Sequence, residues 1–169
     1  ANSVLHSILE DSSQEPMVRH EAAEALGAIG SEASLQILEQ YRADPVCEVA
    51  ETCELALERI RWLHSPKSHE TLPDSPYNSV DPAPPSITGD VTELKSVLLD
   101  ETATLFERYR AMFALRNLRS KEAIEALGSG LKCGSALFRH EVAFVLGQLQ
   151  DVEGVPFLRE SLEDCQENE

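Results

Sequence analysis

Apolar residues recur along most of the chain at the three- and four-residue spacing of an amphipathic helix, and no stretch shows strand-like alternation. Pro16 and Pro45 stand where two of these helices would begin, at a position where a missing N–H costs nothing. The chain is therefore expected to be all-α, with at least eight helices paired antiparallel. First helices of the pairs are expected near 2–11, 33–42, 91–100, 121–132 and 153–164, and second helices near 16–29, 46–63, 104–119 and 137–149.

Internal similarity indicates that these helix pairs are repeats of one unit. Val18–Ile29 realigns on Val49–Ile60, and Arg108–Leu118 realigns on Arg139–Leu149, both with a shift of 31 residues. A period of this length is typical of a solenoid of helix pairs, in which no pair can bury its apolar face alone. The sequence therefore predicts a helical-repeat solenoid.

One segment interrupts the helical pattern. Residues 64–90 carry six of the nine prolines, separated by Ser, Thr, Asp and Asn, and such a composition favours extended chain. The chain is therefore divided into N-terminal repeats (1–63), a proline-rich linker (64–90) and C-terminal repeats (91–169). The linker is either a flexible tether or a device that lets two half-solenoids face each other, since its extended length is sufficient.

Composition narrows the classes of partner. The net charge of -16 argues against nucleic acid, whose phosphates would be repelled, and fits either a basic partner or simply a solvated helical surface. No apolar run approaches the length of a membrane span and no signal peptide is visible, so the cytoplasm is the expected location.

Buried thiols are favoured over disulfides or a zinc site for the cysteines of this chain. The four cysteines are Cys47, Cys53, Cys133 and Cys165.

Two copies of Arg-His-Glu carry the candidate chemistry. His20-Glu21 and His140-Glu141 fall in the first turn of equivalent helices, within a shared RHExAxxLG pattern. Imidazole and carboxylate together suit iron, manganese or zinc. Neighbouring helical residues point about 100° apart, so each dipeptide can serve two different metals, or one metal and a substrate.

The structural alternative is that each His satisfies a neighbouring carbonyl and each Glu complements the helix dipole. For two copies in register with identical flanks, the residues leave both readings open. The remaining histidines, His6, His64 and His69, are expected to be solvated.

Longer segments resemble one family, deoxyhypusine hydroxylase, and the resemblance covers essentially the whole chain. They are PMVRHEAAEALGAIG (Pro16–Gly30), VDPAPP (Val80–Pro85), LFERYRAMFALRN (Leu105–Asn117) and CGSALFRHEVAFVLGQLQ (Cys133–Gln150). The resemblance implies HEAT-like helix pairs in two halves, with four His-Glu motifs that hold two irons between them. It also implies a non-haem diiron monooxygenase that uses dioxygen to hydroxylate the deoxyhypusine side chain of a eukaryotic translation factor, forming hypusine.

The resemblance further implies roles for individual residues. His20-Glu21 looks like the second motif of the family and His140-Glu141 like the third, and all four side chains are candidate metal ligands. His20 and Glu141 would contribute to one iron and His140 to the other, while Glu21 would face the cationic amine of the substrate as a buried acid. Gly27 and Gly147 are expected at tight helix crossings, with a role in shaping the pocket as the alternative.

The first and fourth motifs of the family are absent from this sequence. The Leu-Glu-Asp lead-in at 9–11 recurs at 162–164, so the chain is expected to stop where another second helix would start. We therefore expect an incomplete and inactive piece of a longer array, which self-associates through uncovered apolar faces.

Two other functions fit the pattern of repeats. One is a metal-free HEAT-repeat scaffold that binds a protein partner on its concave face. The other is a chromophore lyase of the related short HEAT-repeat class, although the paired RHE motifs are not typical of its array.

Overall fold

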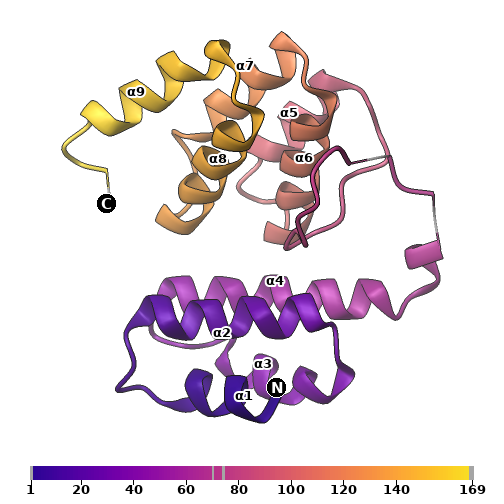
Figure 1. Ribbon diagram of the computed structural model, residues 1–169, viewed down its shortest axis with the longest axis vertical. Helices are drawn as coiled ribbons and strands as arrows, with labels where there is room; N and C mark the ends of the chain where they lie inside the picture. The colour runs from indigo at the N-terminus through magenta and orange to yellow at the C-terminus, as the bar shows by residue number, and fades with distance from the viewer. Residues whose placement is uncertain (1, 70, 74, 168–169) are drawn as a thin grey trace. The chain divides into compact units, whose positions relative to one another are not determined.

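All regular structure is helical in the computed structural model, which describes residues 2–69, 71–73 and 75–167 (Figure 1). Nine α-helices and no strand occur in these residues, which confirms the all-α prediction. None of the described helices combines the length and apolar composition needed to cross a membrane. The helices are α1 (Asn2–Glu10), α2 (Pro16–Ile29), η1 (Glu32–Ser34), α3 (Leu35–Tyr41), α4 (Cys47–Leu63), η2 (Pro66–His69), α5 (Val91–Leu99), α6 (Leu105–Leu118), α7 (Lys121–Gly130), α8 (Ala136–Leu149), η3 (Val152–Gly154) and α9 (Val155–Glu163).

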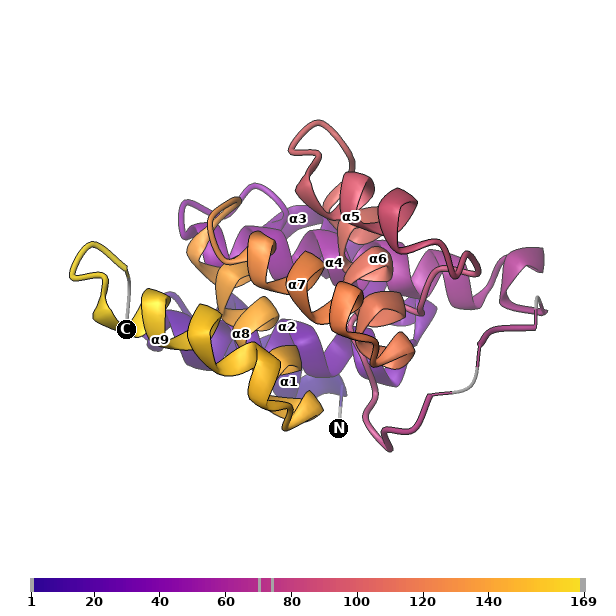
Figure 2. The same cartoon turned by 90° about the horizontal axis from the view of Figure 1, so that it is seen from above.

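The helices belong to two compact units. Unit 1 comprises the chain up to Thr71 together with Ser79–Pro84, and unit 2 comprises Leu72–Asn78 and the chain from Pro85 onward. Within unit 1, α1 and α3 form one layer and α2 and α4 the other (Figure 1). Within unit 2, α5, α7 and α9 form one layer and α6 and α8 the other (Figure 2). The three-part division at 64 and 90 stays a prediction.

Local chemistry explains most helix ends. Pro16 is the first residue of α2, and Gly30 ends that helix in the left-handed conformation (φ 72°), its N–H donating to the Leu26 carbonyl. Pro45, in contrast, lies two residues before α4, so its predicted place at the helix start is wrong. The turn there is set by Asp44, whose carboxylate accepts from the Val46 N–H and directs the chain into the helix. Side-chain caps begin four α-helices of unit 2, from Asp90, Thr104, Ser120 and Ser135.

Close packing of α2 on α4 forms the centre of unit 1. A Cβ built on Gly27 would lie 2.9 Å from the Cβ of Ala56, so the two backbones approach as closely as glycine allows. The tight crossing predicted at Gly27 is therefore present. At Gly147 a Cβ would meet nothing within 4 Å in the described structure, so the same prediction is wrong there, because α8 turns that position outward.

A buried arginine ties the start of each of two second helices to the end of the helix before it. Arg19 Nε donates to the Leu9 carbonyl and Arg108 Nε to the Leu98 carbonyl, each at 2.9 Å and each ten residues back. Arg19 also pairs with Asp44, and both side chains are about 95% buried. The guanidinium of Arg108 lies 4.0 Å from the ring centroid of Phe138 instead. A helix pair is thus fixed by one side chain at its turn.

The linker is irregular apart from the short η2 helix, and no helix passes through Pro82–Pro85, as predicted. It is nevertheless held at several points, so a simple flexible tether does not describe it. In unit 1, Ala83 is fully buried and the Asp81 carbonyl accepts from Arg59 Nε at 3.0 Å. In unit 2, the buried guanidinium of Arg116 lies over the ring of Tyr77, with its Cζ atom 4.5 Å from the centroid of that ring.

All four cysteines are free thiols, but only part of the burial prediction is right. Cys53 is fully buried, and burial raises the pKa of its thiol to about 12. Cys133 is half-buried, whereas Cys47 and Cys165 are exposed. Cys47 precedes the buried face of α4, which begins at Val49, and Cys165 follows the end of α9. Apolar spacing alone does not distinguish these end positions from the core.

The Arg19–Asp44 pair predicts an acid-sensitive contribution to the stability of unit 1. Burial alone would raise the pKa of Asp44, but hydrogen bonds from Arg19 and the Val46 N–H outweigh it and lower the pKa below 3.8. Asp44→Asn should cost about 3–5 kcal/mol at neutral pH, because it leaves a buried guanidinium without its counter-charge. Since the folded pKa is lowered, this difference should persist above pH 3.8 and shrink as the pH falls through the folded value.

Urea unfolding as a function of pH measures this difference. The control is Glu39→Gln, which removes one of the two exposed carboxylates that pair with Arg61 and should cost under about 1 kcal/mol. Equal effects of the two substitutions at neutral pH would contradict the role given to the buried pair.

The two glycines give a matched test of helix packing. Gly27→Ala should destabilise unit 1 by about 1–3 kcal/mol, because the added methyl group overlaps Ala56. Gly147→Ala should instead stabilise α8 by about 0.5–1 kcal/mol, because the position is open and alanine loses less entropy in a helix. Thermal unfolding of both variants would show opposite shifts in Tm; shifts of the same sign would contradict the packing described for Gly27.

Candidate functional site

His20 lies in the interface between α2 and α4. Its side chain is 10% exposed, and its Nδ1 atom lies 2.6 Å from the Thr52 hydroxyl of α4. The Thr52 hydroxyl donates to the Glu48 carbonyl one turn earlier at 2.7 Å. Thr52 faces α2 because it shares the buried stripe of α4 with Val49, Cys53 and Ala56. The imidazole is therefore held by a polar group inside the interface between the two helices.

The other ring nitrogen of His20 faces a carboxylate of the same helix. Nε2 lies 3.6 Å from Glu24 Oε2, and Glu24 is the residue four positions later, on the same face of α2. The adjacent Glu21 is exposed, since neighbouring helical residues point in different directions. The buried environment expected for Glu21 is therefore not found in unit 1, where α2 presents this carboxylate outward.

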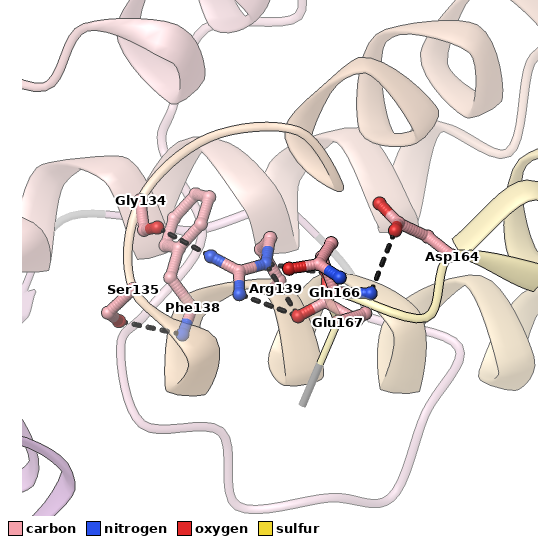
Figure 3. A network of polar contacts seen from close by, with 7 residues as sticks. All are labelled: Gly134, Ser135, Phe138, Arg139, Asp164, Gln166 and Glu167. Carbon is pink, nitrogen blue, oxygen red and sulfur yellow. Dashed lines mark hydrogen bonds and ion pairs between the residues drawn. The ribbon is translucent and has the colours of Figure 1, made fainter. Parts of the chain in front are cut away.

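Both motif arginines are anchored. In unit 2, Arg139 donates from Nη2 to Glu167 Oε1 at 2.6 Å and from Nε to Glu167 Oε2 at 2.8 Å, and from Nη1 to the Gly134 carbonyl at 2.8 Å (Figure 3). The hydrogen bond to Glu167 raises the pKa of the arginine. Ser135 caps α8 by accepting from the Phe138 N–H. The first turn of α8 is thus fixed from two sides, as Arg19 fixes α2.

The second motif differs from the first in its surroundings. His140 is exposed and Glu141 is partly buried, whereas His20 is buried and Glu21 exposed. Phe144, which is 53% exposed, occupies the position that corresponds to Glu24. His20-Glu21 belongs to unit 1 and His140-Glu141 to unit 2. The two identical motifs therefore lie in different chemical environments.

The side chains of the motif region are of the types that bind first-row transition metals. An imidazole nitrogen and a carboxylate oxygen that face each other, as in His20 and Glu24, are ligand types that such ions prefer. Within the described residues, no three His, Cys, Asp or Glu side chains gather closely enough to hold an ion. The His-x-x-x-Glu spacing of helix α2 could have pointed to Glu24 in the sequence, whereas Thr52 could be found only from the packing of α4.

The remaining histidines are not all solvated. His6 is half-buried, and its Nε2 lies 3.1 Å from the hydroxyl of the buried Ser34, because α1 packs against the start of the next helix pair. His64 is exposed, as predicted, yet its Nε2 donates to the Gly30 carbonyl at 2.9 Å. The side chain of His69 lies outside the described residues.

Family models identify the repeat architecture of the chain, and sequence comparison identifies its relatives. A HEAT-repeat model matches residues 1–58, and a model described as the PBS lyase HEAT-like repeat matches 107–133 and 138–164. The chain is 60% identical to deoxyhypusine hydroxylase of Drosophila melanogaster, over 100% of this chain and 56% of that protein. It is 59% identical to the Homo sapiens enzyme, over 98% of this chain and 54% of that protein.

A solved structure supports the same relationship. The structure of human deoxyhypusine hydroxylase in complex with glycerol matches with a TM-score of 0.92 and 58% sequence identity, covering 99% of this chain and 58% of that chain. The HEAT-like repeat prediction is thereby confirmed. The chain spans about half the length of the curated relatives that it matches.

Proposed function

This chain belongs to the deoxyhypusine hydroxylase family, and we propose that it contributes to a cytoplasmic monooxygenase that hydroxylates deoxyhypusine to hypusine at a non-haem diiron centre. The observation that carries the proposal is 60% identity across the whole chain, with both Arg-His-Glu motifs on anchored helices. The PBS lyase HEAT-like match covers single repeats, so it supports the architecture rather than a lyase activity.

The proposed metal ligands come from both motifs. His20 and Glu141 would contribute to one iron and His140 to the other, by similarity to the family. Iron, when bound, would supply the activation of dioxygen. The role of the chain is to present imidazole nitrogen and carboxylate oxygen atoms, and Arg19 and Arg139 set the direction of the first helical turn for this purpose.

The proposed substrate is the cationic side chain of deoxyhypusine in a eukaryotic translation factor, with dioxygen as co-substrate. Glu21 is suited to it because its carboxylate is exposed and can accept hydrogen bonds from an ammonium group. The net charge of -16 would favour the approach of a basic protein surface. Glu21 would thus orient the amine while the neighbouring His20 points into the α2–α4 interface.

The test is to separate iron binding from turnover in an active enzyme that contains this sequence. His20→Ala or His140→Ala should remove iron and activity together. Glu21→Ala should retain most of the iron and lower kcat/KM for the translation factor about 10- to 100-fold, the effect of one hydrogen bond to a charged group. Elemental analysis and mass spectrometry of the substrate, which gains one oxygen atom, give the two readouts.

Glu122→Ala is the matched control, because Glu122 is also an exposed acid in the first turn of a helix. It should change neither readout. Equal iron loss in the Glu21 and histidine variants would refute this division of roles. A fully active enzyme without iron would refute the metal proposal, and a protein with neither iron nor activity would favour the protein-binding scaffold.

A second test uses the 169-residue chain alone. The ligands proposed here number two for one iron and one for the other, and so few ligands rarely hold a divalent ion against water. We therefore expect the isolated chain to be inactive and to contain fewer than two irons, as measured by elemental analysis. Two tightly bound irons per chain would show that the proposed ligand set is wrong.

A further inference from the structure

The direction of the hydrogen bonds around Thr52 determines where His20 carries its proton. A threonine hydroxyl has one hydrogen to donate, and Thr52 donates it to the Glu48 carbonyl at 2.7 Å. The same hydroxyl oxygen lies 2.6 Å from His20 Nδ1, so in this contact it can only accept. His20 therefore carries a proton on Nδ1.

With its proton on Nδ1, a neutral His20 ring presents a lone pair on Nε2. That atom lies 3.6 Å from a carboxylate oxygen of Glu24, so two electron-rich atoms face each other. Such an arrangement is favourable when a positively charged species lies beside them. The α2–α4 interface therefore holds the ring in the state in which Nε2 can bind a cation.

We propose that Thr52 is a positioning residue for metal binding by His20: together with the Glu48 carbonyl it fixes the Nδ1–H tautomer and the orientation of the ring. This inference rests on the proposed function, which makes His20 a metal ligand. Metal-binding histidines commonly donate their second ring N–H to such a partner, and losing that partner typically lowers metal affinity 10- to 100-fold. Thr52 acts through its hydrogen bond to His20, so it is a positioning residue rather than a catalytic one.

The repeat pattern explains why the role of Thr52 cannot be recognised from the His-Glu motifs alone. The 31-residue shift that relates α2 to α4 places Thr52 at the position of Glu21, and Glu51 at the position of His20. The motif position of the second repeat thus supplies the support for the histidine of the first. His140, which is exposed, lies in a different setting.

The first experiment reads the tautomer directly and needs no metal. Nitrogen-15 NMR of the 169-residue chain at alkaline pH, where the rings are neutral, should show His20 protonated on Nδ1. His64 is an internal control with the opposite expectation, because its Nε2 donates to the Gly30 carbonyl. Thr52→Val should move the His20 proton toward Nε2, and Thr52→Ser, which keeps the hydroxyl, should restore Nδ1–H.

The second experiment measures weak metal binding by the same chain: Zn²⁺ is titrated in excess, and the nitrogen-15 shift of His20 Nε2 reports the fraction bound. Thr52→Val should weaken Zn²⁺ binding about 10-fold or more, while Thr52→Ser should retain it. The dispersion of the amide spectrum checks that each variant is folded, and if Thr52→Val is unfolded, the tautomer of His20 in the unsubstituted chain decides the test.

The outcomes separate the two proposals. A His20 ring protonated on Nε2 in the unsubstituted chain, or a tautomer and affinity unchanged by Thr52→Val, would overturn the role of Thr52. A shift of Nδ1 rather than Nε2 on Zn²⁺ addition would overturn it as well. If the tautomer behaves as expected but His20→Ala leaves the iron of the active enzyme intact, the proposed ligand role of His20 fails, and the positioning role fails with it.

Discussion

The buried arginine at the start of a second helix is the interaction on which the rest of each unit depends. A guanidinium group that leaves water must find several acceptors, because an unsatisfied buried charge costs far more than a hydrogen bond returns. Arg19 meets this demand with the Leu9 carbonyl and Asp44, and Arg108 with the Leu98 carbonyl and the ring of Phe138. The partly buried Arg139 is held in a similar way by Gly134 and Glu167. These contacts fix the rotation of the second helix about its own axis. That rotation also decides where the next two residues point, which in α2 and α8 are the histidine and glutamate.

The same anchored turn leads to different chemistry in the two units because of what packs beside it. In unit 1, α4 lies close to α2, and the crossing at Gly27 and Ala56 brings Thr52 within hydrogen-bond distance of His20. In unit 2, His140 is exposed and has an aromatic residue, Phe144, in place of Glu24 one turn later. Protein groups therefore determine which ring nitrogen of the buried His20 is protonated, whereas the exposed His140 is in contact with water.

Helical periodicity predicted the helices well because one buried face per helix is enough to define them. The ends of α2, α6 and α8 lie within two residues of the prediction, and the tight crossing at Gly27 follows from a small residue on a buried face. Predictions that depend on a partner helix were less reliable. Gly147 and Cys47 have helical spacing but no neighbour covers them, and His6 is half-buried because Ser34 lies beside it. The helical spacing of His20 and Glu24 can be read from the sequence, whereas Thr52 became visible only when the packing of α4 against α2 was known.

Cys53 lies in the core of unit 1, on the same helix face as Thr52, and electrostatic contact with Asp44 adds to the effect of burial on its pKa of about 12. A thiol in this state hardly reacts with alkylating or oxidising reagents, because the thiolate is the reactive form. Cys47 and Cys165, being exposed, would react first under the same conditions. The slow labelling of Cys53 then requires the core of unit 1 to open. Its rate measures how often this core, which lies beside His20, opens in the native protein, independently of any catalytic assay.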